Sequence, residues 1–402
     1  MMRWLMAVGS LFIVFMGMLA VSIPVSTVDA QGFATNTPRA DEVTISTQVA
    51  PAQSTLIPTQ TQIAEPVSPP AELSYPPECE YVPGQTINAA CRAFIDASPS
   101  PDIDPIALDG YTLDNYAFWR VGPSPVDKYN APNGTITATI PQGYNFVNAQ
   151  DSTSVPGWIQ IEGGDWIQDT TAEYTQASYL TGARISEDWQ LPFAIILDTT
   201  GLYASSIPGQ DQDPESGLVM LRYQRYNIYA ETYDDEGWRW YMVGPDQWIK
   251  QTFVSVVKTV DRPEGVTGRW VAVDLYEQNL VAYEDNKPVF ATLVSSGVAG
   301  NDTNEGVFQV WARLSRDAMS GATGAPDAYD LQSVPWTMYF DGDISLHGTY
   351  WHDIFGYRTS HGCVNLSISD ARWVYEWTGQ DTPNENGDID SFVYVHSSGE
   401  YR

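Results

Sequence analysis

From Tyr75 to about Val260 the chain consists of short runs of alternating apolar and polar residues, separated by Gly, Pro, Asn or Asp. This spacing is typical of short strands joined by tight turns. Trp270 to Leu275 and Leu280 to Tyr283 show the same alternation closer to the C-terminus. The sequence therefore predicts a mainly β protein, and its 402 residues predict more than one domain.

The chain before Tyr75 has a different composition. Trp4 to Ile23 is an uncharged apolar run behind Arg3, and Val28-Asp29-Ala30 resembles a signal-peptide cleavage site. The run is also long enough to span a bilayer, so residues 1–30 are either a removed signal peptide or a retained N-terminal membrane anchor. Both outcomes predict an extracytoplasmic protein. Residues 31–74, rich in Thr, Pro, Gln, Ala and Ser, are predicted to be an extended linker.

The charge of the chain excludes one class of partner. Asp and Glu number 50 and Lys and Arg number 19, which gives a formal net charge of −31. A surface of that sign repels phosphate backbones. Nucleic acid is therefore not an expected partner.

The three cysteines divide into a pair and a single residue. Cys79 and Cys91 lie close together in the sequence, within a short segment at residues 75–124. In an oxidising compartment they predict a disulfide, with two unrelated buried thiols as the alternative. Cys363 has no partner within the chain and is a candidate reactive thiol.

Two stretches 82 positions apart match each other: Trp158 to Ile167 and Trp240 to Ile249. Each has Trp, an aliphatic residue three positions later, and Trp-Ile eight positions later. The pair resembles tandem bacterial SH3-like modules, which implies two small β-barrels at residues 125–199 and 200–260. Such modules often contact cell-wall peptides; alternatively, these tryptophans fill the barrel cores.

All four histidines of the chain lie near its C-terminal end, and three of them, His347, His352 and His361, closely precede Cys363. A thiol becomes a nucleophile when a neighbouring imidazole takes its proton, so this clustering predicts cysteine nucleophilic catalysis. Zinc ligation by one Cys and three His is the alternative. The spacings lack the usual rhythm of zinc ligands, so no metal is expected.

The residues around this cysteine carry a more specific signal: Ser360-His361-Gly362-Cys363-Val364-Asn365, preceded by Leu346-His347-Gly348-Thr349. They resemble the signature of the L,D-transpeptidase (YkuD) catalytic domain, and the resemblance extends over about residues 268–396. Asn304 departs from it, because the family commonly has Pro at that position of a Thr-Pro-x-Gly turn. The resemblance implies a β-sandwich at residues 265–402 with one substantial helix. Ser369 or Asp370 is expected to cap this helix, and Gly379 to end it.

The resemblance and the chemistry together imply the following roles. Cys363 is the nucleophile, His347 is the base held by a carbonyl near Gly348, and His361 assists. The N–H groups of Gly362 and Cys363 are expected to form an oxyanion hole. The stretch between the two halves of the motif is a lid over the cleft, with His352 on its surface. The expected substrate contacts come from Ser360, Asn365, Gly348, Tyr350, Trp351 and Arg358.

By the same resemblance, the expected function is peptidoglycan L,D-transpeptidation. Cys363 attacks the carbonyl of the third residue of a stem peptide, and an amine of a second stem resolves the thioester to a 3-3 cross-link in the cell wall. No cofactor is implied, and carbapenems are the expected inhibitors. Three alternatives remain open: an L,D-carboxypeptidase, a transpeptidase that anchors proteins to the wall, and a non-enzymatic wall-binding scaffold.

Overall fold

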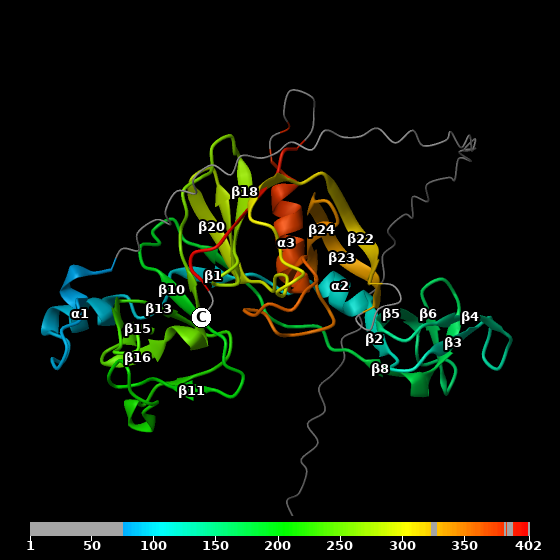
Figure 1. Ribbon diagram of the computed structural model, residues 1–402, viewed down its shortest axis with the longest axis horizontal. Coiled ribbons are helices and arrows are strands. Elements are labelled where there is room, and N and C mark those ends of the chain that lie inside the picture. The colour runs from blue at the N-terminus through cyan, green and yellow to red at the C-terminus, as the bar shows by residue number, and fades with distance from the viewer. Residues whose placement is uncertain (1–74, 323–327, 382, 384–388, 401–402) are drawn as a thin grey trace, which may run out of the picture. The chain divides into compact units, whose positions relative to one another are not determined.

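The computed structural model describes residues 75–322, 328–381, 383 and 389–400 (Figure 1). The predicted leader at 1–30 and linker at 31–74 lie outside these residues. The described part is mainly β, as the sequence predicts. Among the helices of this part, none has the length and hydrophobicity needed to cross a bilayer.

Two large sheets contain most of the strands. The first has the order β1 (Ile103–Pro105), β9 (Ala183–Ile185), β20 (Lys287–Leu293), β19 (Asn279–Glu284), β18 (Arg269–Asp274), β26 (Phe392–His396) and β21 (Gly306–Gln309). The main path of the second is β25 (Val364–Leu366), β24 (Ile344–Gly348), β23 (Tyr329–Asp341), β5 (Tyr144–Asp151), β6 (Trp158–Ile161), β7 (Trp166–Gln168), β3 (Val126–Tyr129) and β4 (Ile136–Ile140). Off this path, β2 (Ala117–Val121) pairs with β5, β8 (Ala172–Tyr174) pairs with β2, and β22 (Ala312–Gly321) pairs with β23.

The remaining strands form smaller sheets. These are β13 (Arg225–Asn227) with β10 (Phe193–Ile196) and β17 (Val254–Val257); β11 (Leu202–Tyr203) with β12 (Val219–Met220); and β14 (Ala230–Tyr233) with β15 (Arg239–Gly244) and β16 (Gln247–Lys250). The helices are α1 (Ala89–Ala97), α2 (Gly110–Asn115) and α3 (Ile368–Thr378). Four 3₁₀ turns complete the elements: η1 (Pro77–Cys79), η2 (Asp169–Thr171), η3 (Pro214–Ser216) and η4 (Gln251–Phe253).

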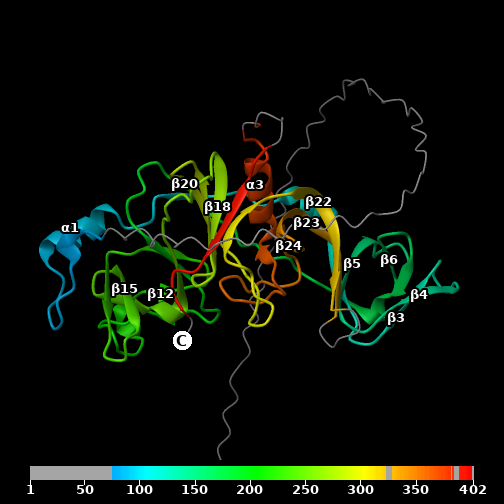
Figure 2. The same cartoon turned by 45° about the horizontal axis from the view of Figure 1, so that its top comes forward.

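Helix α3 lies between β18–β20 and β22–β24 in both views (Figures 1 and 2). Its apolar residues Ile368, Ala371 and Val374 are fully buried in one core with residues of both sheets. The helix begins earlier than the sequence suggested, because Ser367 is its cap and accepts a hydrogen bond from the N–H of Asp370. The carboxylate of Asp370 bonds elsewhere, which is why neither predicted residue caps the helix. Gly379 follows the last helical residue, as predicted.

The matched tryptophan stretches form matching elements. The first gives the hairpin β6–β7, then η2 and β8, and the second gives the hairpin β15–β16, then η4 and β17. Trp158, Trp240 and Trp248 are buried, as the core alternative expected. Their description as SH3-like modules stays a prediction.

The strands of the predicted modules also join the large sheets. β5 pairs in parallel with β23, so that Tyr144 lies opposite Tyr329. β9 pairs with β20 at the other sheet. In addition, Phe118 and Phe146 belong to the core that contains α3. The hydrophobic core is therefore continuous across the boundary that the sequence placed near residue 265.

Near the start of the described residues, Cys79 and Cys91 form a disulfide that joins η1 to α1. Cys363 is free.

Candidate active site

The register of two parallel strands brings the motif residues together. β24 and β25 pair so that Leu346 lies opposite Val364 and His347 lies opposite Asn365. Because side chains alternate along a strand, His347 and Asn365 share one face with the residues two positions before them, Ser345 and Cys363. The Cys363 Sγ atom lies 3.7 Å from Ser345 Oγ and 3.7 Å from the carbonyl of Asp343.

A tight turn precedes the cysteine. Gly362 has φ = +119°, a conformation that L side chains rarely adopt, so glycine is required at this position. The Ser360 hydroxyl accepts a hydrogen bond from the Gly362 N–H at 3.1 Å and donates one to the Cys363 carbonyl. Thr303 Oγ1 donates to the Gly362 carbonyl at 2.7 Å. These bonds fix the direction in which the chain enters β25.

The two N–H groups predicted to form an oxyanion hole differ in their partners. The Gly362 N–H donates to Ser360 in this arrangement. Among the described residues, the Cys363 N–H has no backbone partner. Of the two predicted donors, the Cys363 N–H is therefore the one free to meet a substrate oxygen in this arrangement, and the oxyanion hole stays a prediction.

The contacts of the His347 ring favour the tautomer with the proton on Nδ1. This atom lies 3.3 Å from the Gly348 carbonyl, which can only accept, and 3.5 Å from the Thr349 hydroxyl, which can also accept, so Nε2 is left with a lone pair. The side chain is 2% exposed, and this burial lowers the pKa of His347 to about 4. Burial also raises the pKa of the Cys363 thiol. Both groups are therefore neutral at pH 7 before substrate arrives.

Both residues line a cavity of about 410 Å³. Its other walls come from β5, β22, β23 and the segment between the two halves of the motif. The complete lining is Tyr144, Met319, Tyr329, Leu331, His347, Trp351, His352, Ile354, Thr359, Ser360, His361, Cys363 and Asn365. No Asp or Glu is among these residues, although the chain contains 50.

The structure separates the six predicted substrate contacts into two groups. Ser360, Trp351 and Asn365 line the cavity. Gly348, Tyr350 and Arg358 do not, and burial or pairing explains each case.

A Cβ at Gly348 would lie 2.9 Å from Pro335 Cγ and 3.2 Å from Ile368 Cα, so this glycine permits close packing rather than substrate contact. Tyr350 is fully buried, stacked on Phe118 with ring centroids 3.7 Å apart. Arg358 forms an ion pair with Asp302. The sequence pattern could not reveal these partners, because they lie far away along the chain.

His361, predicted to assist catalysis, lies at the cavity with an exposed side chain, and its ring packs 5.4 Å from the ring of Tyr329. His396 is buried at the end of β26 and is absent from the cavity lining. Within the described residues, no group of three or more His, Cys, Asp or Glu side chains is arranged to hold a metal ion.

His352 is more integrated than a residue on a lid surface. Its Nδ1 accepts the N–H of Ile354 at 3.1 Å, and its Nε2 lies 2.9 Å from the side-chain amide of Asn365. Because Nδ1 accepts, the neutral ring carries its proton on Nε2, which lies 3.2 Å from the Thr359 hydroxyl as well as beside Asn365. His352 therefore contacts a side chain beside His347.

The segment that contains His352 is also anchored from outside. The Asp353 carboxylate accepts hydrogen bonds from Ser178, from Arg222 at 3.1 Å and from the Tyr223 hydroxyl at 3.1 Å. Phe355 is fully buried. The predicted lid is thus packed against preceding parts of the chain.

Sequence reasoning missed one wall of the cavity. Tyr144 belongs to β5, outside the segment that resembles the family, and its hydroxyl donates to the Trp351 carbonyl at 3.2 Å. Tyr329 lies opposite it on β23. The parallel pairing of β5 with β23 forms this wall. A short sequence motif cannot predict such a pairing, because the two strands are far apart in the chain.

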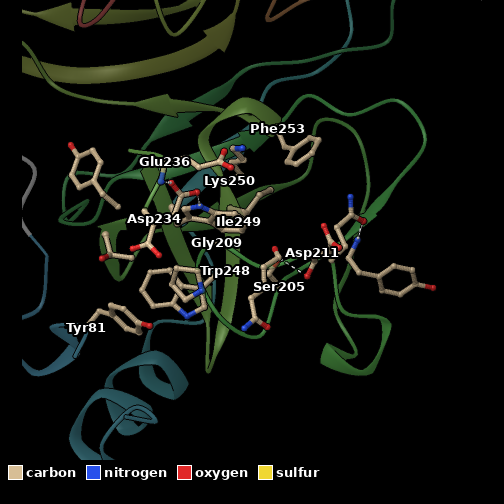
Figure 3. Close-up of a pocket in the computed structure, with 18 of the residues that line it drawn as sticks. Tyr81, Ser205, Gly209, Asp211, Asp234, Glu236, Trp248, Ile249, Lys250 and Phe253 are labelled. Atoms are coloured by element: carbon tan, nitrogen blue, oxygen red, sulfur yellow. Dashed lines mark hydrogen bonds between the residues drawn. The ribbon is translucent and has the colours of Figure 1, made fainter. Parts of the chain in front are cut away.

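A second cavity, of about 800 Å³, lies among β11, β14–β16 and the loop at 205–212 (Figure 3). It is lined by aromatic residues that include Tyr81 and Trp248, and by four acidic residues: Asp211, Asp234, Asp235 and Glu236. It contains no cysteine or histidine. Cys363 and His347 thus line the smaller, acid-free cavity and not this one.

Comparisons with known proteins find similarity over the segment that contains Cys363 and His347. Residues 268–385 match the model of the YkuD L,D-transpeptidase catalytic domain. The Bacillus subtilis (strain 168) protein YciB, whose name as an L,D-transpeptidase is provisional, is 25% identical over 121 residues. That match covers 27% of this chain and 59% of YciB.

Solved structures give similar matches. A crystal structure of an L,D-transpeptidase (Yku) from Stackebrandtia nassauensis is 29% identical with a TM-score of 0.26, covering 34% of this chain and 58% of that chain. A mutant L,D-transpeptidase from Enterococcus faecium is 25% identical with a TM-score of 0.28, covering 35% of this chain and 55% of that chain. From the family model and the curated relative, residues 268–385 are identified as an L,D-transpeptidase catalytic domain of the YkuD family.

Proposed function

We propose that this protein is an exported peptidoglycan L,D-transpeptidase that forms 3-3 cross-links through an acyl-enzyme on Cys363. One observation carries the proposal. Cys363 and the neutral imidazole of His347 line the same cavity, within the segment that matches the family model. The apolar run at residues 4–23 supports export.

In the first half-reaction, the Cys363 sulfur attacks the carbonyl carbon of the third stem residue, and His347 Nε2 takes the thiol proton. The Cys363 N–H donates to the oxygen that becomes negative in the tetrahedral intermediate. As this intermediate collapses, the bond to the terminal D-amino acid breaks and His347 returns the proton to the leaving amine. A thioester remains on Cys363.

In the second half-reaction, an amine of another stem attacks the thioester. His347 takes a proton from this amine and returns it to the departing thiolate, which restores the free thiol and leaves a new amide bond. Water as the acceptor would make the protein a carboxypeptidase, and a protein amine would make it an anchoring transpeptidase. We propose the stem amine because the curated relative carries a transpeptidase name.

The residues before the catalytic domain are proposed to contact the cell wall as SH3-like modules. The cavity among β11 and β14–β16 supports this role, because it offers aromatic faces and carboxylates to a ligand (Figure 3). A non-enzymatic wall-binding scaffold would also use the cavity among β11 and β14–β16, but it would have no need of the thiol of Cys363.

The test is product analysis of two purified stem peptides incubated with the full chain. We expect the mass of a dimer that has lost one terminal D-amino acid. A shortened monomer alone would establish the carboxypeptidase instead. Unchanged peptides, together with bound peptide, would favour the scaffold.

A further inference from the structure

Arg120 on β2 lies next to Tyr144, which lines the catalytic cavity. In the antiparallel pairing of β2 with β5, Arg120 lies opposite Phe146, so Arg120 shares a face of the sheet with Phe146 and Tyr144. The Arg120 guanidinium lies over the Tyr144 ring, with Cζ 5.3 Å from the ring centroid. The opposite neighbour of Tyr144 in the sheet is Tyr329, whose ring packs against His361. A row of side chains therefore leads from the catalytic turn to Arg120.

Arg120 is exposed, and no ion pair within 4 Å is found for it among the described residues. Glu173 is its cross-strand neighbour on β8, yet the guanidinium lies over Tyr144 instead. Free cations are scarce in a chain with 19 basic and 50 acidic residues. Most arginines on the described surface, such as Arg184 and Arg358, pair with carboxylates.

The charges around the two cavities differ in a way that bears on the ligand. The cavity of Figure 3 has four acidic residues and one basic residue, Lys250, in its lining, whereas the catalytic cavity has no acidic residue. The excess of carboxylates disfavours an anionic ligand group in the first cavity, and such a group would meet no carboxylate in the lining of the second. A planar guanidinium beside the acid-free cavity is suited to bind a carboxylate with two parallel hydrogen bonds.

We propose that Arg120, held over Tyr144, binds the carboxylate on the second residue of the peptide substrate, a group that does not belong to the attacked third residue. The inference rests on the proposed function for the identity of the peptide. It adds that strands outside the family segment, β2 and β5, select anionic peptides. The distance supports a remote carboxylate, because Arg120 stands two strands from Tyr329, roughly 10 Å at the usual spacing.

Binding can be measured apart from catalysis in a Cys363→Ala background by calorimetry. The probes are a synthetic tetrapeptide stem with a free carboxylate on its second residue and the same peptide with that carboxylate amidated. We expect Arg120→Gln to weaken binding of the free-carboxylate peptide about ten-fold, the size of one charge-assisted hydrogen bond. Binding of the amidated peptide should not change. Arg184→Gln, which removes an exposed arginine from another strand, is the matched control and should change neither affinity.

A second arm uses salt and the conservative variant. The affinity of the Arg120 protein for the free-carboxylate peptide should fall as salt rises from about 0.05 to about 0.5 M, and Arg120→Gln should flatten that dependence. Relative to Arg120→Gln, Arg120→Lys should restore part of the affinity. The lysine ammonium keeps the positive charge but lacks the two parallel N–H donors of the guanidinium.

Equal affinities of parent and Arg120→Gln for the free-carboxylate peptide would overturn the proposal, and so would equal losses for both peptides. These outcomes are distinct from failure of the proposed function, which would appear as a chain that binds the peptides but never forms an acyl-enzyme on Cys363.

Discussion

At the scale of single residues, burial decides the charge states of the catalytic pair. A thiol and an imidazole in solution exchange a proton readily near pH 7, but here burial disfavours both the thiolate and the imidazolium. The resting pair is therefore neutral. In the proposed mechanism the proton therefore moves when the sulfur attacks, at the moment when the Cys363 N–H can stabilise the new negative charge.

The first prediction concerns the pH dependence of acylation. The reactive form needs neutral His347, whose pKa is about 4. The rate of Cys363 acylation by a carbapenem should therefore be flat from about pH 5.5 to 8 and fall below pH 5 as the imidazole becomes protonated. Stopped mixing and intact-mass measurement give this profile. A rate that climbs steadily from pH 7 to 9 would instead mean that free thiolate is the attacking species.

The second prediction separates the histidines. His347→Ala removes the proton acceptor, so acylation at pH 7 should fall by about 10²–10⁴-fold, with part of the loss recovered at high pH. His352→Ala leaves His347 in place and removes contacts to Ile354, Thr359 and Asn365, so its loss should be far smaller. In an Asn365→Ala background, His352→Ala should have a smaller effect than in the parent. If His352→Ala is the more damaging change, the base is misassigned.

The sequence revealed the residues whose chemistry is local, and the reason is physical. Cys363, His347, Ser360 and Gly362 sit in a turn and a strand end that a short motif describes completely. Tyr144 acts through strand pairing, which depends on a partner strand far away along the chain. Tyr350 was predicted from its place beside the motif to contact substrate, but its side chain is buried in the hydrophobic core.

At the scale of elements, the buried side chain of Asp370 ties α3 to the sheet that contains β9 and β20. The Asp370 carboxylate accepts hydrogen bonds from Thr292 Oγ1 on β20 at 2.5 Å and from the N–H of Gly182 at 2.6 Å. Burial raises the pKa of Asp370 to about 6. The sequence predicted the helix from a cap at Ser369 or Asp370 and a stop at Gly379, but it missed the cap at Ser367 because the long-range partners of Asp370 are not visible in a local pattern.

The third prediction follows from that pKa. Between about pH 4 and 6 the folded protein holds a proton on Asp370 that the unfolded chain releases, so this group makes the free energy of unfolding fall as pH rises. Asp370→Asn mimics the protonated acid and should remove this contribution, on the order of 2–3 kcal/mol. Denaturant unfolding of both proteins at pH 4, 5, 6 and 7 tests it. A constant difference between the two across this range would contradict the assignment.

At the scale of the whole molecule, the strands before residue 265 complete the catalytic fold. β9 covers the edge of β20, and β5 covers the edge of β23. Phe118 stacks on Tyr350 in the catalytic segment, and Phe193 and Ile195 pack in one core with Trp270. The sequence indicated separate modules because each has its own turns and tryptophans, and pairing between distant strands leaves no mark in such a pattern.

The fourth prediction is that a chain beginning at Arg262 is much less stable than one beginning at Tyr75. It loses the partners of two strand edges and several buried side chains, each contributing about 1.5–3 kcal/mol. Thermal unfolding should show a strongly lowered or absent cooperative transition for the shorter chain. A sharp transition at the same temperature for both would mean that the catalytic domain folds alone.

The central claim about the whole molecule is that Cys363 is the nucleophile. The full chain should gain the mass of one carbapenem, and fragmentation should locate the adduct on Cys363, the only free cysteine among the described residues. Cys363→Ala should gain no mass while keeping the circular dichroism of the parent. An adduct on Cys363→Ala, or one on another residue of the parent, would contradict the mechanism.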